Sequence, residues 1–150
     1  MHPKKIVITG VLGGFLLLVT SFLCGVIANV LLPYNIFEIP GMRPMTDPVA
    51  TLFFLYPFVL AFTAAILYDF IHGSLGGDSV RRGVVFGLLL FIIVTIPNQF
   101  VIWSSMYYPA GFYLSNILNG IIGFPLFGIL CVVIWGKEGV EALKKEYRTI

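Results

Sequence analysis

The chain has 150 residues, of which 59% are hydrophobic and only 11% are charged, whereas about 25% of the residues in an ordinary globular domain are charged. So few charged residues could not cover a water-soluble surface, which excludes a soluble enzyme or binding domain. The formal net charge of +2 gives no sign of nucleic-acid binding.

The charged residues are unevenly distributed. None lies in residues 6–32, 49–68 or 83–136. A bilayer core about 30 Å thick needs about 20 apolar residues in a helix, because unpaired backbone groups are costly in hydrocarbon. We therefore predict an all-α fold, a membrane four-helix bundle forming a single transmembrane domain over 1–150, with helices at about 6–32, 49–71, 82–103 and 111–135.

The first predicted helix, 6–32, follows the basic residues Lys4 and Lys5. A signal peptide would have a similar start, but its core has about 7–15 apolar residues, and no small-x-small cleavage site closes this longer run cleanly. We interpret the segment as a retained helix. Its G-x-x-x-G pair, Gly10 and Gly14, favours close packing against another helix.

The connection 33–48 contains four prolines, which forbid a continuous helix. It also carries Glu38, Arg43 and Asp47, and we expect Arg43 and Asp47 to pair. The connection could fold back as a lid over a ligand or lie flat at the interface, and its composition favours the flat arrangement.

The second predicted helix, 49–71, ends near Asp69 and His72. A carboxylate and an imidazole three residues apart could relay a proton. At a helix end facing water, they more often are ordinary boundary residues. The Gly-rich connection 72–81 is typical of a flexible turn.

The third and fourth predicted helices, 82–103 and 111–135, repeat features of the first two. Gly83 and Gly87 open the third helix as Gly10 and Gly14 open the first, and prolines lie in the second and fourth. The pattern suggests a parallel two-plus-two repeat, although Gly and Pro are common in membrane helices generally. Further small-residue pairs predicted to lie in helix contacts are Ala61 with Ala65 and Gly120 with Gly123.

The tail 136–150 places Val140, Leu143 and Tyr147 at helical spacing among charged residues. We predict a short amphipathic helix at the cytoplasmic surface.

The distribution of Lys and Arg predicts the orientation. On the side of the predicted loop 33–48, the only basic residue is Arg43. The other eight lie on the side of the termini: Lys4, Lys5, Arg81, Arg82, Lys137, Lys144, Lys145 and Arg148. We predict a multi-pass protein of the cell (inner or plasma) membrane with both termini cytoplasmic.

The amide side chains within the apolar helices all fall in the predicted outer half, where Ser115 also lies: Asn29, Asn98, Gln99, Ser115, Asn116 and Asn119. An unsatisfied amide in hydrocarbon costs several kcal/mol. These side chains either cross-link the helices, which we favour, or line an outward-facing pocket. With the loop charges Glu38, Arg43 and Asp47, they form our candidate ligand-binding set.

No constellation of catalytic residues is found in the sequence. Cys24 and Cys131 fall at different depths and cannot pair, and no Cys/His cluster indicates a metal, so both are interpreted as small buried thiols. We expect no catalytic residues, no metal site and no cofactor. A membrane enzyme acting on a lipid or quinone therefore ranks last among the functions considered.

Several segments resemble a broad family of small, uncharacterised prokaryotic membrane proteins with four spans. They are the Gly-rich stretch from Thr9 to Phe22, Ala64-Ala-Ile-Leu-Tyr-Asp-Phe-Ile, Arg82-Gly-Val-Val-Phe-Gly-Leu and Ile96-Pro-Asn. The resemblance implies the fold and topology, and supplies no activity.

The sequence thus favours a non-enzymatic bundle that binds a lipid, a small amphipathic ligand or a membrane partner through its outward-facing polar cluster. The alternative is a small oligomeric transporter or channel lined by the same amides. The expected partners are membrane lipids and either further copies of the chain or another membrane protein, with no nucleic acid.

Overall fold

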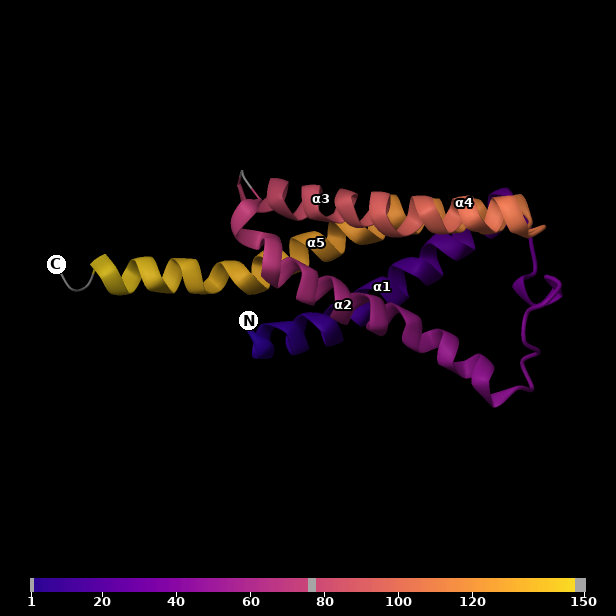
Figure 1. Cartoon of the computed structure of the whole chain (residues 1–150), viewed down its shortest axis with the longest axis horizontal. Helices are drawn as coiled ribbons and strands as arrows, with labels where there is room; N and C mark the ends of the chain where they lie inside the picture. The colour runs from indigo at the N-terminus through magenta and orange to yellow at the C-terminus, as the bar shows by residue number, and fades with distance from the viewer. Residues whose placement is uncertain (1, 76–77, 148–150) are drawn as a thin grey trace.

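The computed structural model describes residues 2–75 and 78–147, with the backbone alone for 137–147. Four helical spans of 29, 27, 27 and 27 residues cover Pro3–Leu31, Pro48–Ser74, Ser79–Ser105 and Ala110–Gly136. At 1.5 Å per residue, each span is about 40 Å long, enough to cross a hydrocarbon core of about 30 Å. The four helices predicted from the charge gaps are confirmed, and they pack as a membrane bundle (Figure 1).

The first span is the single helix α1 (Pro3–Leu31), whereas the second is composite. It begins as the 3-10 helix η2 (Pro48–Leu55), continues as α2 (Tyr56–Ile71) and ends in the 3-10 turn η3 (His72–Ser74). The sequence predicted one helix over 49–71. The tighter winding ends next to Pro57, which has no N–H to donate to the carbonyl four residues earlier.

The third span changes winding at its centre. It consists of α3 (Ser79–Leu90), a π-helical turn η4 (Phe91–Thr95) and α4 (Ile96–Ser105). Pro97 is the second residue after the π turn, and its ring would clash with the carbonyl of residue 93 in a regular α-helix. The wider turn accommodates the proline and rotates the residues that follow.

The fourth span is α5, which runs without a break from Ala110 to Tyr147. The tail therefore continues the transmembrane helix, where the sequence predicted a separate short helix after Trp135. The side chains of Val140, Leu143 and Tyr147, on which the predicted amphipathic face depends, lie outside the described residues.

Glycines allow the helix axes to approach closely. The Cα positions of Gly83 and Gly87 on α3 lie against the backbone of α5 near Ile129 and Pro125, where a methyl group would collide. Gly10 and Gly14 on α1 face phenylalanine rings of α2. The predicted packing role of the small residues is confirmed, and Ala61 and Ala65 are fully buried.

The helices form an open arrangement. α1 and α5 pack together at the centre, α2 packs against α1, and α3 packs against α5 (Figure 1). Within the described parts of the chain, α2 makes no comparably extensive contact with α3 or α4. The predicted two-plus-two repeat therefore stays a prediction, because the two hairpins differ in winding and the contacts between them are unequal.

The two ends of the bundle differ. At the end that carries both chain termini, here called the terminal end, the Tyr68 ring contacts Phe86 at 4.9 Å and Trp135 at 5.2 Å between ring centroids, so α2, α3 and α5 meet. At the opposite end, the loop end, α2 and η2 diverge from α3 and α4 (Figure 1). No described residue of η2 is buried.

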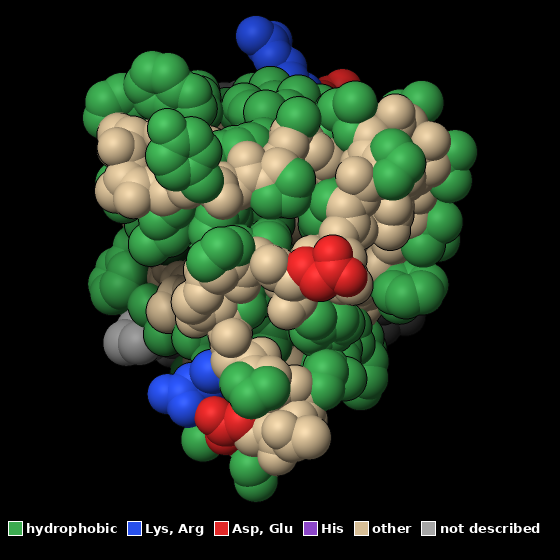
Figure 2. All heavy atoms as spheres, turned by 90° about the vertical axis from the view of Figure 1, so that its right-hand side faces the viewer, with side chains coloured by type: hydrophobic (Ala, Val, Ile, Leu, Met, Phe, Trp, Pro, Cys, Tyr) green, Lys and Arg blue, Asp and Glu red, His purple; other side chains and the backbone are tan. Residues whose placement is uncertain are grey.

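The outside of the bundle is apolar. Large hydrophobic side chains are exposed on every span, among them Phe22, Phe70 and Trp103 at about 70% exposure. Figure 2 faces the loop end, where few charged side chains lie among hydrophobic ones. Such a surface suits lipid and not water, so the chain is an integral membrane protein with four spans.

Candidate functional site

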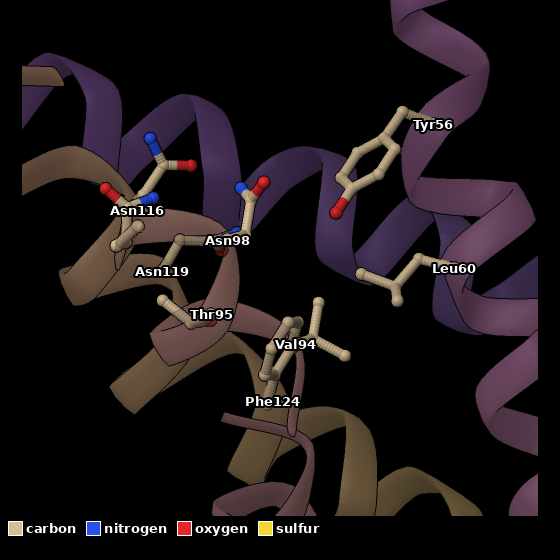
Figure 3. A pocket seen from close by; sticks show the side chains of 9 residues that line it. Tyr56, Leu60, Val94, Thr95, Asn98, Asn116, Asn119 and Phe124 are labelled. Atoms are coloured by element: carbon tan, nitrogen blue, oxygen red, sulfur yellow. The ribbon is translucent and has the colours of Figure 1, made fainter. Parts of the chain in front are cut away.

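A cleft lies between α2 on one side and α4 and α5 on the other (Figure 3). About 320 Å³ of empty space lies among its lining residues, and this volume includes space that is open to the surroundings. Its polar wall consists of six side chains, namely Tyr56, Thr95, Asn98, Gln99, Asn116 and Asn119. Its apolar wall consists of Leu60, Val94 and Phe124. Of the described residues that line it, none carries a charge.

Local helix geometry gathers these groups. Thr95, the last residue of the π turn, is followed by Asn98 and Gln99 at i+3 and i+4, so the three share one face of the third span. Asn116 and Asn119, spaced i and i+3, share a face of α5. Gly120 permits the contact between these spans, because its Cα faces the Phe91 ring and the Thr95 hydroxyl.

Only some of the cleft amides form hydrogen bonds that join two helices. Asn119 accepts a hydrogen bond from the Thr20 hydroxyl of α1 at 3.2 Å, which joins two helices. Asn116 donates to the Phe112 carbonyl of its own helix at 2.9 Å. The predicted cross-linking of helices is therefore found at Asn119, whereas the hydrogen bond of Asn116 stays within α5.

Gln99 has an unusual environment. Both polar atoms of its side-chain amide are buried, and neither has a hydrogen-bond partner among the described residues. An unsatisfied buried amide costs about 1–3 kcal/mol. Because Gln99 lines the cleft, it is positioned to recover this free energy by bonding to a molecule held there.

Two of the six helix residues in the predicted set lie outside the cleft. Asn29 is exposed near the end of α1, where its side-chain oxygen accepts a hydrogen bond from the Tyr34 backbone N–H at 3.3 Å. The Ser115 hydroxyl faces Gly25 of α1. The structure thus brings together Asn98, Gln99, Asn116 and Asn119, and separates Asn29 and Ser115 from them.

The loop charges also lie apart from the cleft, since none of its lining residues belongs to 33–48. Arg43 donates to Asp47 at 2.6 Å, which confirms the predicted pair. Asp47 also accepts from the Val49 N–H and caps η2, and the bond from Arg43 is the main reason that its pKa is lowered. Glu38 accepts from the Asn35 side chain at 2.9 Å. This arrangement agrees with a flat loop.

Sequence reasoning missed the apolar wall of the cleft and two of its polar residues, Tyr56 and Thr95. Thr95 carries a readable signal, because it lies three residues before Asn98 on the same helix face. Tyr56 carries none, because its role depends on where α2 lies. In Figure 3 its phenol ring reaches from α2 toward the amides of α4 and α5.

A second polar cluster lies at the terminal end, centred on Asp69. Its carboxylate accepts hydrogen bonds from the His2 backbone N–H at 3.1 Å and from the Trp135 indole N–H at 3.2 Å. The His2 Nδ1 lies 2.7 Å from Asp69 Oδ1. His72 instead contacts the backbone carbonyl of Asp69. Asp69 thus fastens α1 and α5 to α2. It therefore has a packing role that an ordinary residue at a helix boundary would not have.

The cysteines and possible metal ligands offer no further centre within the described residues. Cys24 and Cys131 are free and buried, as predicted. No group of three His, Cys, Asp or Glu side chains in this part of the chain could hold a metal ion.

Comparisons of the chain with protein-family models, with curated proteins and with solved structures give no match. The structure therefore defines a class, an integral membrane protein with four spans, and the family implied by the sequence resemblance is not identified. The function has to be argued from the cleft.

Proposed function

We propose that this membrane protein binds the polar end of a membrane lipid or similar amphipathic molecule in the cleft between α2 and α4. The observation that carries the proposal is the buried, unpartnered amide of Gln99 in a wall of amides and hydroxyls. The apolar wall of Leu60, Val94 and Phe124 suits the adjoining hydrocarbon of such a molecule.

The shape of the bundle supports access from the membrane. α2 and α3 meet at the terminal end through Tyr68 and Phe86 and diverge at the loop end. A lipid moving within one leaflet can therefore reach the cleft sideways. A membrane protein partner, or a second copy of the chain, could use the same opening.

The distribution of basic residues supports placing the loop end outside the cell. Lys4, Lys5, Arg81 and Arg82 belong to the terminal end, and Arg43 belongs to the loop end. Because cytoplasmic segments are enriched in Lys and Arg, we infer cytoplasmic termini in a plasma or inner membrane. The cleft then serves the outer leaflet.

An apolar core separates the cleft from the polar cluster around Asp69, which favours binding over transport. Between the cleft and Asp69, the helices contribute buried apolar side chains, including Leu17, Phe86 and Phe127. A transport pathway needs polar groups along its length. This core instead closes the cleft toward the terminal end.

The test compares Gln99→Leu with Asn29→Leu, each purified as the full chain in a mild non-ionic detergent. Native mass spectrometry measures co-purified lipid, and thermal unfolding measures stability. We expect Gln99→Leu to lose retained lipid, while its lipid-free form becomes about 1 kcal/mol or more stable because a buried unsatisfied amide is removed. Asn29→Leu should retain lipid as the wild type does.

The combination of results separates binding from misfolding, since a misfolded variant would lose stability together with lipid. Unchanged lipid retention in Gln99→Leu would overturn the proposal. The same spectra report the mass of the assembly, and therefore whether a second copy is present.

A further inference from the structure

We infer that the molecule held in the cleft presents an uncharged polar group, such as a hydroxyl or an ester carbonyl, and not a phosphate. The inference rests on the proposed binding function and specifies its ligand class. Three observations carry it: the depth of the amides, the absence of charge in the lining, and the mixture of donors and acceptors.

The depth of the amides follows from helix geometry. Asn98 lies seven residues from the end of α4 at Ser105, and Asn116 lies six residues from the start of α5 at Ala110. At 1.5 Å per residue, both are about 10 Å inside the loop end. Because each span exceeds the hydrocarbon thickness by about 5 Å on each side, the amides lie about 5 Å below its boundary.

A charged group at that depth needs a countercharge. The lining residues given above are uncharged, and the charges of the loop end, Glu38, Arg43 and Asp47, belong to the loop 33–48. Arg43 and Asp47 also neutralise each other. An anionic phosphate in the cleft would lose its water without gaining a cation, which makes its burial unfavourable.

The polar wall suits an uncharged group well. Amides offer both N–H donors and oxygen acceptors, and the Tyr56 and Thr95 hydroxyls can act as either. A hydroxyl both donates and accepts, and an ester carbonyl accepts. The unpartnered Gln99 amide can therefore bond through its nitrogen and its oxygen to a ligand that carries both groups.

Two lipids with identical acyl chains provide the probes. The full-length protein, freed of lipid in a non-ionic detergent, is incubated with equimolar 1,2-dioleoylglycerol and dioleoyl phosphatidylglycerol, and native mass spectrometry counts the adducts. We expect the wild type to retain the diacylglycerol at least about tenfold more often, and Gln99→Leu to lose that preference.

A variant with an added positive charge tests the cause of the lipid selectivity. Asn98 is not buried in the bundle, and at about 5 Å below the hydrocarbon boundary a lysine side chain can extend its ammonium to the interface. Asn98→Lys should therefore be tolerated, and it introduces the missing cation at the cleft. We expect it to shift retention toward phosphatidylglycerol. Asn29→Lys places the same charge on an exposed asparagine outside the cleft and should leave the preference unchanged.

The outcomes separate this inference from the proposed function. If phosphatidylglycerol binds the wild type as well as or better than diacylglycerol and is lost in Gln99→Leu, the uncharged ligand class is overturned and the binding function stands. If neither lipid depends on Gln99, both are overturned. An equal shift in Asn98→Lys and Asn29→Lys would also overturn the inference, because the lining charge would not set the preference.

Discussion

The indole N–H of Trp135 donates a hydrogen bond of 3.2 Å to the carboxylate of Asp69, which joins α5 to α2 across the terminal end. The same carboxylate holds the start of α1 through His2. The Asp69 side chain is only 3% exposed. Three of the four spans are therefore fastened at one carboxylate, while the opposite end of the bundle is left open.

Replacing this carboxylate should loosen the bundle. In Asp69→Asn the charge that faces His2 is lost and an amide N–H is placed where an acceptor is needed. We expect the free energy of unfolding to fall by about 2 kcal/mol, which lowers the apparent melting temperature by about 5 °C. Thermal unfolding monitored by tryptophan fluorescence in detergent measures the change.

Asp78→Asn is the matched control. Asp78 caps α3 by accepting from the Arg81 N–H at 2.9 Å, and asparagine caps a helix about as well as aspartate. Its melting temperature should stay close to that of the wild type. Equal melting temperatures for the wild type and Asp69→Asn would show that this carboxylate does not hold the helices together.

Much of the fold can be predicted from the sequence, because long uncharged runs have few alternatives in a membrane. The four spans and the packing role of Gly10, Gly14, Gly83 and Gly87 belong to this group. The altered winding beside Pro57 and Pro97 is harder to predict. A proline shows that the regular helix is disturbed, and the form of the disturbance depends on the packing around it.

The candidate site also has a part that the sequence predicts and a part that it does not. Asn98, Gln99, Asn116 and Asn119 share helix faces that the sequence reveals, and the structure places them around one cleft. Asn29 has the same chemistry at a similar predicted depth, yet it is turned away. Its direction depends on how α1 is rotated in the bundle, which periodicity in so uniformly apolar a helix does not show.

The close approach of α3 to α5 predicts opposite effects for one substitution at two glycines. In Gly87→Ala the added methyl group would collide with the backbone of Pro125, which cannot move without displacing α5. We expect a loss of about 2 kcal/mol or more from such overpacking. The melting temperature in detergent should fall accordingly.

Gly136→Ala provides the comparison. No atom lies within 4 Å of the position that its methyl group would occupy, and alanine stabilises a helix by about 1 kcal/mol relative to glycine. The melting temperature should be unchanged or slightly raised. A similar fall in both variants would indicate that helix winding, and not the contact with Pro125, accounts for the effect at Gly87.

The Arg43–Asp47 pair should give the loop a defined pH dependence. The hydrogen bond from Arg43 lowers the pKa of Asp47 below its ordinary value. A lowered pKa means that the pair contributes its stabilisation fully above the ordinary carboxyl pKa of about 3.9 and loses it as the pH falls through the lower value. Carboxyl ¹³C chemical shifts of aspartate-labelled protein in micelles report the titration.

Arg43→Gln should raise the Asp47 titration midpoint toward the ordinary value, because the cation that favours the carboxylate is removed. The bond from the Val49 N–H remains and keeps part of the shift. The carboxyl signal of Asp78, which bonds to a backbone N–H at the terminal end, should be the same in both proteins at neutral pH. An unchanged midpoint for Asp47 would mean that the pair does not persist in solution.

The inferred orientation predicts which surface residues can be labelled from outside the cell. Met45 is exposed in the loop 33–48, and Ser74 is exposed in the turn at the terminal end. The native thiols can be removed by Cys24→Ala and Cys131→Ala, after which Met45→Cys and Ser74→Cys each provide a single reactive thiol. A membrane-impermeant maleimide should label position 45 in intact cells, and position 74 only after the membrane is permeabilised.

Labelling at positions 45 and 74 together distinguishes the inferred orientation from the reversed one. Each thiol acts as the accessibility control for the other, because both are exposed and lie at opposite ends of a 27-residue span. Labelling of position 74 alone in intact cells would reverse the orientation. The cleft would then serve the cytoplasmic leaflet, and the eight basic residues on the side of the termini would face outward, against the usual effect of Lys and Arg on membrane insertion.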